Sequence, residues 1–212
     1  MNAQSLIDMF SAMAEAIELK KDSLCELDGV IGDADHGITM SLGFTAIRSA
    51  LAQTDSATAT PTEIFNTAAS SFLNAVGASA GPLYATAFMR AGASVKGKSE
   101  LDKRSLADAI IAMADGIQFR GKAERGDKTM LDAWLPAADT ARHTADDASV
   151  PIAAMIQKIA TAAVAGSQES IDMLAKKGRS AKLGKRSIGH MDAGAASTAV
   201  LLTAMADYIA TQ

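Results

Sequence analysis

Residues 4–26 read QSLIDMFSAMAEAIELKKDSLCE, and this stretch indicates the kind of fold the chain adopts. Its apolar side chains follow the spacing of a helix face and not the alternation of a strand; they are Leu6, Phe10, Met13, Ile17 and Leu24. Similar helical patterns recur at residues 38–51, 62–76, 82–95, 103–119, 129–144, 151–176 and 194–211. No run has the alternating β-branched residues that a strand requires. The sequence therefore predicts an all-α fold of about eight helices.

Prolines mark several of the predicted helix boundaries. Pro61, Pro82 and Pro151 each lie near a predicted start, where a missing N–H costs nothing, whereas Pro136 falls inside the sixth predicted helix and is expected to kink it. No Pro/Gly/Ser-rich linker and no abrupt change of composition divides the chain. We therefore expect a single domain over residues 1–212.

The composition limits the possible functions and locations. Hydrophobic residues make up 49% of the chain and aromatic residues only 4%, which predicts a core of Ala, Leu, Ile and Met. A net charge of −4 argues against nucleic-acid binding, which needs a clustered basic surface. The N-terminus has neither the basic nor the apolar region of a signal peptide, and no segment approaches a membrane span, so we expect a cytoplasmic protein without membrane contact. The single Cys25 excludes an internal disulfide and is expected to be a buried thiol in a reducing compartment.

The first predicted helix leads into an acidic stretch, DGVIGDADHGIT, at residues 28–39. Asp28, Asp33 and Asp35 would repel one another unless a cation lies among them, which suggests a site for a hard metal ion. A calcium loop of the EF-hand type does not fit, because its fifth, sixth and twelfth positions would be Gly37, Ile38 and Phe44. Zinc does not fit a chain with one Cys and three scattered His, so oxygen ligands point to Mg²⁺. A solvated turn of Asp and Gly residues is the alternative.

Two further glycine-rich segments each open a predicted helix. Residues 77–82 read GASAGP, and their small side chains would let an anion approach the N–H groups of a helix start; a plain turn is the simpler interpretation. Residues 121–130 read GKAERGDKTM, which differs from a Walker loop because Asp127 separates glycine from lysine and no strand precedes it. Lys128 would contact either a phosphate or a loop carboxylate.

A third segment, residues 178–194, is basic in an acidic protein. Asp192 is well placed to cap the N-terminus of the last predicted helix, and Arg179 could clamp a phosphate with its paired donors. Lys182 and Lys185 are more typical of a solvated surface. Together, an acidic metal loop, glycine turns that open helices and an arginine are what a Mg-nucleotide site requires.

Three motifs then identify a family. Residues 32–37 (GDADHG), 126–130 (GDKTM) and 184–190 (GKRSIGH), in this order in a chain of this length, closely resemble the nucleotide-binding L subunit of dihydroxyacetone kinase. The resemblance covers essentially the whole chain. It implies an antiparallel barrel of eight helices with ADP or ATP bound at one end through magnesium ions, two in number, held by Asp28, Asp33 and Asp35.

The resemblance also implies a set of nucleotide-binding residues. Those expected against the phosphates are His36, Gly37, Ile38, Thr39, Ser79 and Ala80. Those expected to border the adenine are Gly121 and Met130. Those expected to close the site are Arg179, Asp192, Ala193 and Gly194. It implies no catalytic side chain, and His36 could donate to a phosphate, orient an aspartate or become phosphorylated.

In the family, a separate K subunit binds the triose covalently, so this chain would supply only the phosphoryl group. ADP would be rephosphorylated by a phosphoryl-carrier protein or exchanged for ATP. Thr39, Ala80, Met191 and Ala193 depart from the usual Asn, Ser, Gln and Pro, which leaves the donor and the ketose open, erythrulose included. A stand-alone metal-dependent hydrolase and a non-catalytic nucleotide-binding module are the rival interpretations.

Overall fold

The computed structural model describes residues 1–77 and 79–212, which form helices joined by turns and loops. The α-helices are α1 (Ala3–Ile31), α2 (His36–Leu51), α3 (Pro61–Ala75), α4 (Ala80–Ser94), α5 (Lys103–Gly121), α6 (Leu131–Thr144), α7 (Ile152–Glu169) and α8 (Ala193–Ala210). Two short 3₁₀ helices, η1 (Ser170–Asp172) and η2 (Ser180–Ser187), lie between α7 and α8. The described residues contain no strand, so the predicted all-α class is confirmed.

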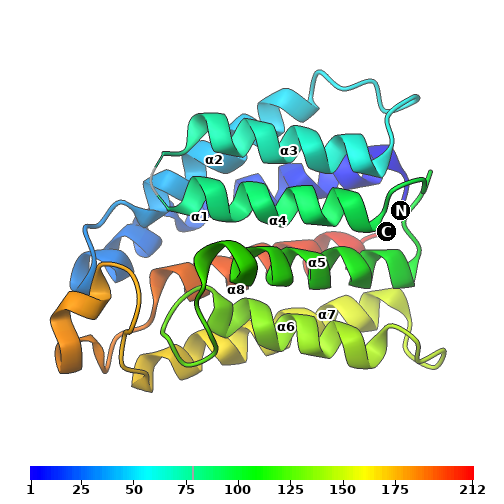
Figure 1. The fold of residues 1–212 in the computed structure, drawn as a ribbon. Coiled ribbons are helices and arrows are strands. Elements are labelled where there is room, and N and C mark those ends of the chain that lie inside the picture. Colours follow the sequence, from blue (N-terminus) through cyan, green and yellow to red (C-terminus); the bar gives the residue numbers. More distant parts are fainter. Residues whose placement is uncertain (78) are drawn as a thin grey trace.

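The helices form a closed ring. Each packs against the helices that precede and follow it in the chain, and α8 packs back against α1. Successive helices alternate in direction, so their connections gather at two ends (Figure 1). The N- and C-termini lie at one end, while the segment between α7 and α8 lies at the other. The predicted antiparallel eight-helix barrel is thereby confirmed.

Local sequence explains several helix boundaries. Thr60 and Glu63 form a reciprocal capping box at the start of α3, directly before Pro61. Pro151 immediately precedes α7, and Pro82 lies in the first turn of α4, so both fall where a backbone donor is not needed. Pro136 lies inside α6, which runs on to Thr144.

Two predicted boundaries were wrong. The first helix continues to Ile31 rather than ending at residue 26, so Asp28 lies in its last turn. The seventh helix ends at Glu169 rather than at residue 176, and the chain continues through η1 and η2. The basic segment expected as a loop therefore contains a 3₁₀ helix, η2, which is interrupted at Gly184.

The core is aliphatic, as expected, but it also contains a compact aromatic cluster. The rings of Phe10, Phe44, Phe72 and Phe88 are fully buried and meet mostly edge to face, and Tyr84 packs among them. Few aromatic residues are present, yet most lie together at the centre of the ring.

Helix α8 is the most apolar element. It is the one described helix long and apolar enough to cross a membrane, but 72% of its apolar stretch is buried inside the ring, as in a core helix. Cys25 is partly exposed on α1, so the expectation of a buried thiol was wrong.

Candidate functional site

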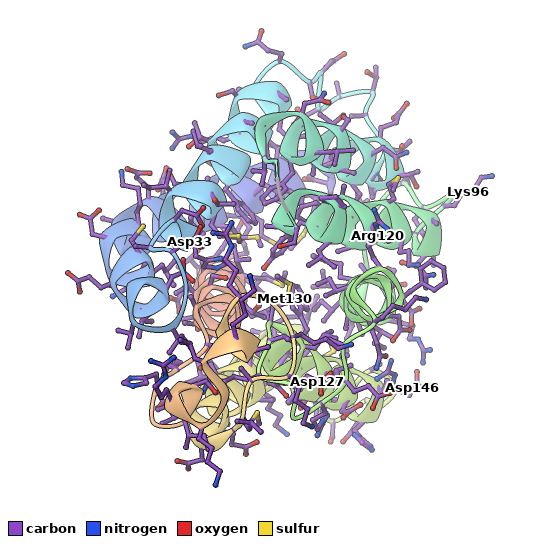
Figure 2. All side chains as sticks on the ribbon, turned by 60° about the vertical axis from the view of Figure 1, so that its left-hand side comes forward. Asp33, Lys96, Arg120, Asp127, Met130 and Asp146 are labelled. Carbon is purple, nitrogen blue, oxygen red and sulfur yellow. The ribbon has the colours of Figure 1, made fainter. Side chains whose placement is uncertain are left out.

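A cavity of about 570 Å³ opens at the end of the ring opposite the termini. Segments far apart in the sequence line it: the end of α1, the starts of α2, α4 and α8, the end of α5, and the loops around residues 121–131 and 177–179. Figure 2 shows Asp33, Met130 and Arg120 on different sides of this end of the molecule. Drug-sized ligands occupy pockets of roughly 300–1,000 Å³, so the cavity is large enough for a nucleotide.

A tight turn brings three carboxylates together at the rim. Asp28 lies in the last turn of α1, Asp33 in the connection, and Asp35 directly before α2. One Asp28 oxygen accepts hydrogen bonds from the backbone N–H groups of Asp35 at 3.0 Å and His36 at 3.3 Å, which folds the turn back on itself. A Cβ on Gly32 would lie 2.1 Å from the other Asp28 oxygen, so only glycine fits there.

This arrangement fits a hard cation. One oxygen of each carboxylate lies within 4.8 Å of the others, with Asp28 partly buried and the other two exposed. In the described part of the chain, a single ion pair, from Arg179 to Asp33, offsets three negative charges. The donor set consists of carboxylate oxygens, which Mg²⁺ prefers. The cluster therefore has the chemistry of a magnesium site more than that of a solvated turn.

His36 begins α2 and points across the ring toward α8. Its Nε2 lies 2.8 Å from the Ser197 hydroxyl. Because that hydroxyl donates to the Gly194 carbonyl at 3.0 Å, Nε2 is assigned as the donor to Ser197. Burial lowers the pKa of His36, while the nearby Asp28 carboxylate acts in the opposite direction. The His36 imidazole thus connects the start of α2 to the start of α8.

The wall between α5 and α6 is shaped by a buried carboxylate. Asp132 is only 1% exposed, and its two oxygens accept hydrogen bonds from the backbone N–H groups of Gly126 at 2.6 Å and Thr129 at 2.8 Å. Lys128 makes neither of the contacts expected from sequence alone. Its ammonium donates instead to the backbone carbonyls of residues 170, 171 and 190.

Asp192 caps α8, as predicted from the sequence: one oxygen accepts a hydrogen bond from the Ala195 N–H at 2.8 Å. Burial raises the pKa of Asp192 and the Asp132 carboxylate acts in the same direction, whereas the Ala195 hydrogen bond and Lys128 lower it; the net result is a pKa of about 7. The start of α8 therefore presents backbone donors to the cavity beside a carboxyl that is easily protonated.

Most residues singled out from the sequence line this one cavity. They are Asp28, Asp33, Asp35, His36, Thr39, Ser79, Ala80, Gly121, Met130, Arg179, Asp192, Ala193 and Gly194. Gly37 and Ile38 do not line it. Gly37 is pressed against α1, where an added Cβ would lie 1.9 Å from the Lys21 carbonyl, and Ile38 faces outward with 51% exposure. Ala78, in the glycine turn before α4, lies outside the described residues.

The cavity also includes residues that the sequence did not single out. Leu83, Ile117, Arg120 and Lys177 line it. Ile117 lies four residues before Gly121 on the same face of α5, so helical spacing from Gly121 could have identified it, whereas Arg120 is simply adjacent to Gly121 in the sequence. Leu83 and Lys177 carried no such signal.

Comparisons with known proteins agree with this geometry. The family model described as the DAK2 domain matches residues 30–207. The ADP-binding subunit DhaL of the PEP-dependent dihydroxyacetone kinase 2 of Listeria innocua is 38% identical over 190 residues, covering 90% of this chain and 87% of the relative. The corresponding subunit of Escherichia coli is 33% identical and covers 95% of this chain and 94% of its own length.

A longer relative and a solved structure complete the comparison. The D-erythrulose kinase of Mycolicibacterium smegmatis is 33% identical over 94% of this chain, but the match covers only 34% of that protein. The crystal structure of the dihydroxyacetone kinase of C. freundii in complex with AMP-PNP and Mg²⁺ superimposes with a TM-score of 0.75 at 23% identity, over 98% of this chain and 34% of the other. This structural likeness shows a shared fold.

Proposed function

Because the chain belongs to the family of the DAK2 domain, we propose that it is the nucleotide-binding, phosphoryl-donating subunit of a kinase for dihydroxyacetone or a related ketose. The proposal depends above all on one feature. Three carboxylates, with oxygens within 4.8 Å of one another, stand at the rim of a cavity large enough for a nucleotide. We place the protein in the cytoplasm, without membrane or nucleic-acid partners.

In this proposal, Asp28, Asp33 and Asp35 hold two Mg²⁺ ions. The ions would neutralise the phosphate oxygens of bound ADP or ATP. The starts of α2, α4 and α8 all face the same cavity, and helix N-termini favour anions because their first N–H groups lack intrahelical partners. These three starts provide the phosphate cradle.

Side chains around the cradle complete the nucleotide site. Thr39 and Ser79 offer hydroxyl donors, and Ala80 contributes its backbone. Arg179, now paired with Asp33, can reach a phosphate once a cation takes over that carboxylate. Gly121 and Met130 line the cavity together with the apolar Leu83 and Ile117, and we place the adenine against this part of the wall. Gly37 and Ile38 do not line the cavity, so the proposal gives their side chains no contact with the nucleotide.

The chain itself contributes positioning and charge neutralisation rather than a reactive side chain. Phosphoryl transfer gains most from these two effects. We propose that a separate K subunit holds the ketose covalently and presents its hydroxyl to the terminal phosphate at the cavity mouth. His36 is held by Ser197, which favours a positioning role over a covalent relay.

The phosphoryl donor is proposed to be a phosphoryl-carrier protein that recharges bound ADP. The relatives that match over most of their own length are named as PEP-dependent or PTS-dependent. The erythrulose kinases are about three times as long as the matched region, so they resemble this chain only as one part of a larger enzyme. An ATP-dependent erythrulose kinase subunit is the second candidate, because the matched regions remain similar at 28–33% identity.

Reconstitution tests this proposal. The purified chain with Mg²⁺, ATP and dihydroxyacetone should form no dihydroxyacetone phosphate, and addition of a K subunit should start the reaction. Turnover by the chain alone would contradict the division between subunits. Release of inorganic phosphate from ATP by the chain alone would support a hydrolase. ADP that stays bound through dialysis favours the carrier protein as donor, whereas ADP that is lost favours ATP.

A further inference from the structure

Lys128 is an unusually buried lysine beside the cavity. It is only 1% exposed, although its residue lines the cavity wall, and its backbone is left-handed with φ of 61°. Its ammonium donates to the carbonyls of Ser170 at 2.6 Å, Ile171 at 3.3 Å and His190. An ammonium has three N–H donors, so these three acceptors use all of them.

The three carbonyls belong to two chain segments that lead to other walls of the cavity. Residues 170 and 171 begin the segment that carries Lys177, Gly178 and Arg179 to the rim. Residue 190 lies two positions before Asp192, where α8 begins. Lys128 therefore joins its own loop to both segments that would surround a nucleotide from the opposite side.

Other hydrogen bonds connect the same segments. The Gly189 N–H donates to the Ile171 carbonyl at 2.8 Å, and the Asp192 N–H donates to the Ser170 hydroxyl at 3.0 Å. The Lys176 N–H donates to the Asp127 carbonyl at 3.0 Å. Lys128 lies at the centre of this network, because its ammonium contacts both chain segments at once.

The charge of Lys128 distinguishes it from a neutral filler of the same shape. Burial lowers its pKa, while Asp192, Asp172 and Asp132 act in the opposite direction. Burial of an ammonium without hydrogen-bond partners is strongly unfavourable. The three carbonyls therefore stabilise the buried charge, and the same hydrogen bonds keep the carbonyls in place. None of the hydrogen bonds of Lys128 goes to a carboxylate, and none of its donors remains for a phosphate.

We propose that Lys128 is a positioning residue of the nucleotide site, which fixes the segments at residues 170–179 and 188–194 against the loop at 126–130. The inference rests on the proposed function, because the segments fixed by Lys128 matter only if the cavity binds a nucleotide. In a chain with a lysine, a threonine and a glycine in a loop before a helix, phosphate binding is the more obvious role for that lysine. The hydrogen bonds of Lys128 indicate instead that it holds the chain segments of the site in place.

The wild-type protein allows a direct test by NMR. The Lys128 ammonium should give a ¹⁵N signal whose protons are protected from exchange with solvent. The ammonium should keep its hydrogen bonds to the three carbonyls when ADP and Mg²⁺ are added. A signal with a new coupling to phosphorus in the ADP complex would make Lys128 a phosphate ligand and overturn the proposal. This measurement needs no variant to fold.

The variant Lys128→Met tests the consequence. It should bind Mg-ADP about tenfold or more weakly in calorimetry, because the walls lose their common anchor. Hydrogen exchange measured without nucleotide should rise at residues 171–192 and stay unchanged in α3 and α7. Lys128→Arg, which keeps a charge and several donors, should recover part of the affinity.

Two controls separate positioning from general loss of stability. Lys158→Met removes an exposed lysine on α7, and Ile47→Ala opens the buried core near the far end of α2; both should leave ADP affinity within twofold of wild type. Equal exchange increases throughout the Lys128→Met variant, or unchanged ADP affinity, would overturn the proposal. If the wild type binds no ADP, the proposed function fails, yet the exchange data still test whether Lys128 fixes the two segments.

Discussion

Two groups of three aspartates lie at or near the cavity, and they differ in the hydrogen bonds that their oxygens accept. The outer triad, Asp28, Asp33 and Asp35, is partly buried to exposed. Among the described residues, only the Asp28 carboxylate of this triad accepts backbone hydrogen bonds, and Asp33 pairs with Arg179. Most of the oxygens of the outer triad are therefore available to a cation.

The inner triad consists of Asp127, Asp132 and Asp192. Asp127 and Asp132 are 8% and 1% exposed, and Asp192 is partly buried. Each accepts at least one backbone N–H, so these carboxylates are committed to holding the chain. The difference shows that local hydrogen bonding decides which acids fix the chain and which keep oxygens available, as the proposed metal site requires.

The largest expected effect separates the two groups by nucleotide binding. Asp33→Asn should weaken Mg-ADP binding about 100-fold or more, because it removes one of three charged ligands. Its free energy of unfolding should change by less than about 1 kcal/mol, since the Arg179 pair is exposed. Calorimetry with ADP and urea denaturation measure the two quantities. The matched control is Asp22→Asn, an exposed aspartate on α1, and a similar loss of affinity there would contradict the assignment.

The next variant should lose stability more than nucleotide affinity. Asp132→Asn should lower the free energy of unfolding by about 2 kcal/mol, because one of its two backbone donors loses a buried acceptor. ADP affinity should fall less than in Asp33→Asn. Urea denaturation of both variants side by side makes the comparison, and an Asp132→Asn protein as stable as wild type would remove the distinction between the triads.

The raised pKa of Asp192 should make the stability of the protein depend on pH. Its folded pKa of about 7 lies above the ordinary value of 3.8, so the folded protein binds more protons than the unfolded chain between these values. The stability it contributes is fully present below pH 4 and is lost as the pH rises through 7. Asp192→Asn should lack this loss, so the variant should gain about 1 kcal/mol or more relative to wild type from pH 4 to pH 8.

The charged groups that face Asp192 are Asp132, Asp28 and Lys128, and none of them is changed in this comparison. Unfolding measured by urea across that pH range gives the difference directly. A constant difference between the two proteins would mean that Asp192 is already ionised when folded near pH 4.

The smallest effect concerns the contact between the outer triad and its arginine. Arg179→Ala should change the free energy of unfolding by less than about 1 kcal/mol, because the guanidinium is largely exposed. Binding of Mn²⁺ alone should strengthen about two- to fivefold, since Asp33 loses a competitor, while Mg-ADP binding should weaken. Electron paramagnetic resonance for Mn²⁺ and calorimetry for ADP measure both. If the affinities for Mn²⁺ and for Mg-ADP both rose or both fell, the result would contradict a transfer of Arg179 from Asp33 to a phosphate.

Features set by short stretches could be predicted from the sequence. The helices follow from local apolar spacing, the Asp192 cap from its place before α8, and the outer triad from three acids within eight residues. The resemblance to the L subunit supplied other parts of the site, such as Gly121 and Met130, and both line the cavity.

Features set by tertiary packing could not be predicted. The contacts of Lys128 join residues 42 to 62 positions away, so no local pattern reveals them. Gly37 and Ile38 face away from the cavity because α2 packs Gly37 against α1, which fixes the rotation of the helix. The first helix was predicted to end at residue 26, but α1 continues to Ile31, and the Gly32 N–H donates to the Asp28 carbonyl at its end.

The central claim is that the outer triad binds nucleotide through a divalent cation. Titration of ADP into the purified wild-type chain by calorimetry, once with Mg²⁺ and once with a chelator, tests it directly. The affinity should be about 100-fold or more higher with Mg²⁺. Equal affinity under both conditions would contradict the account.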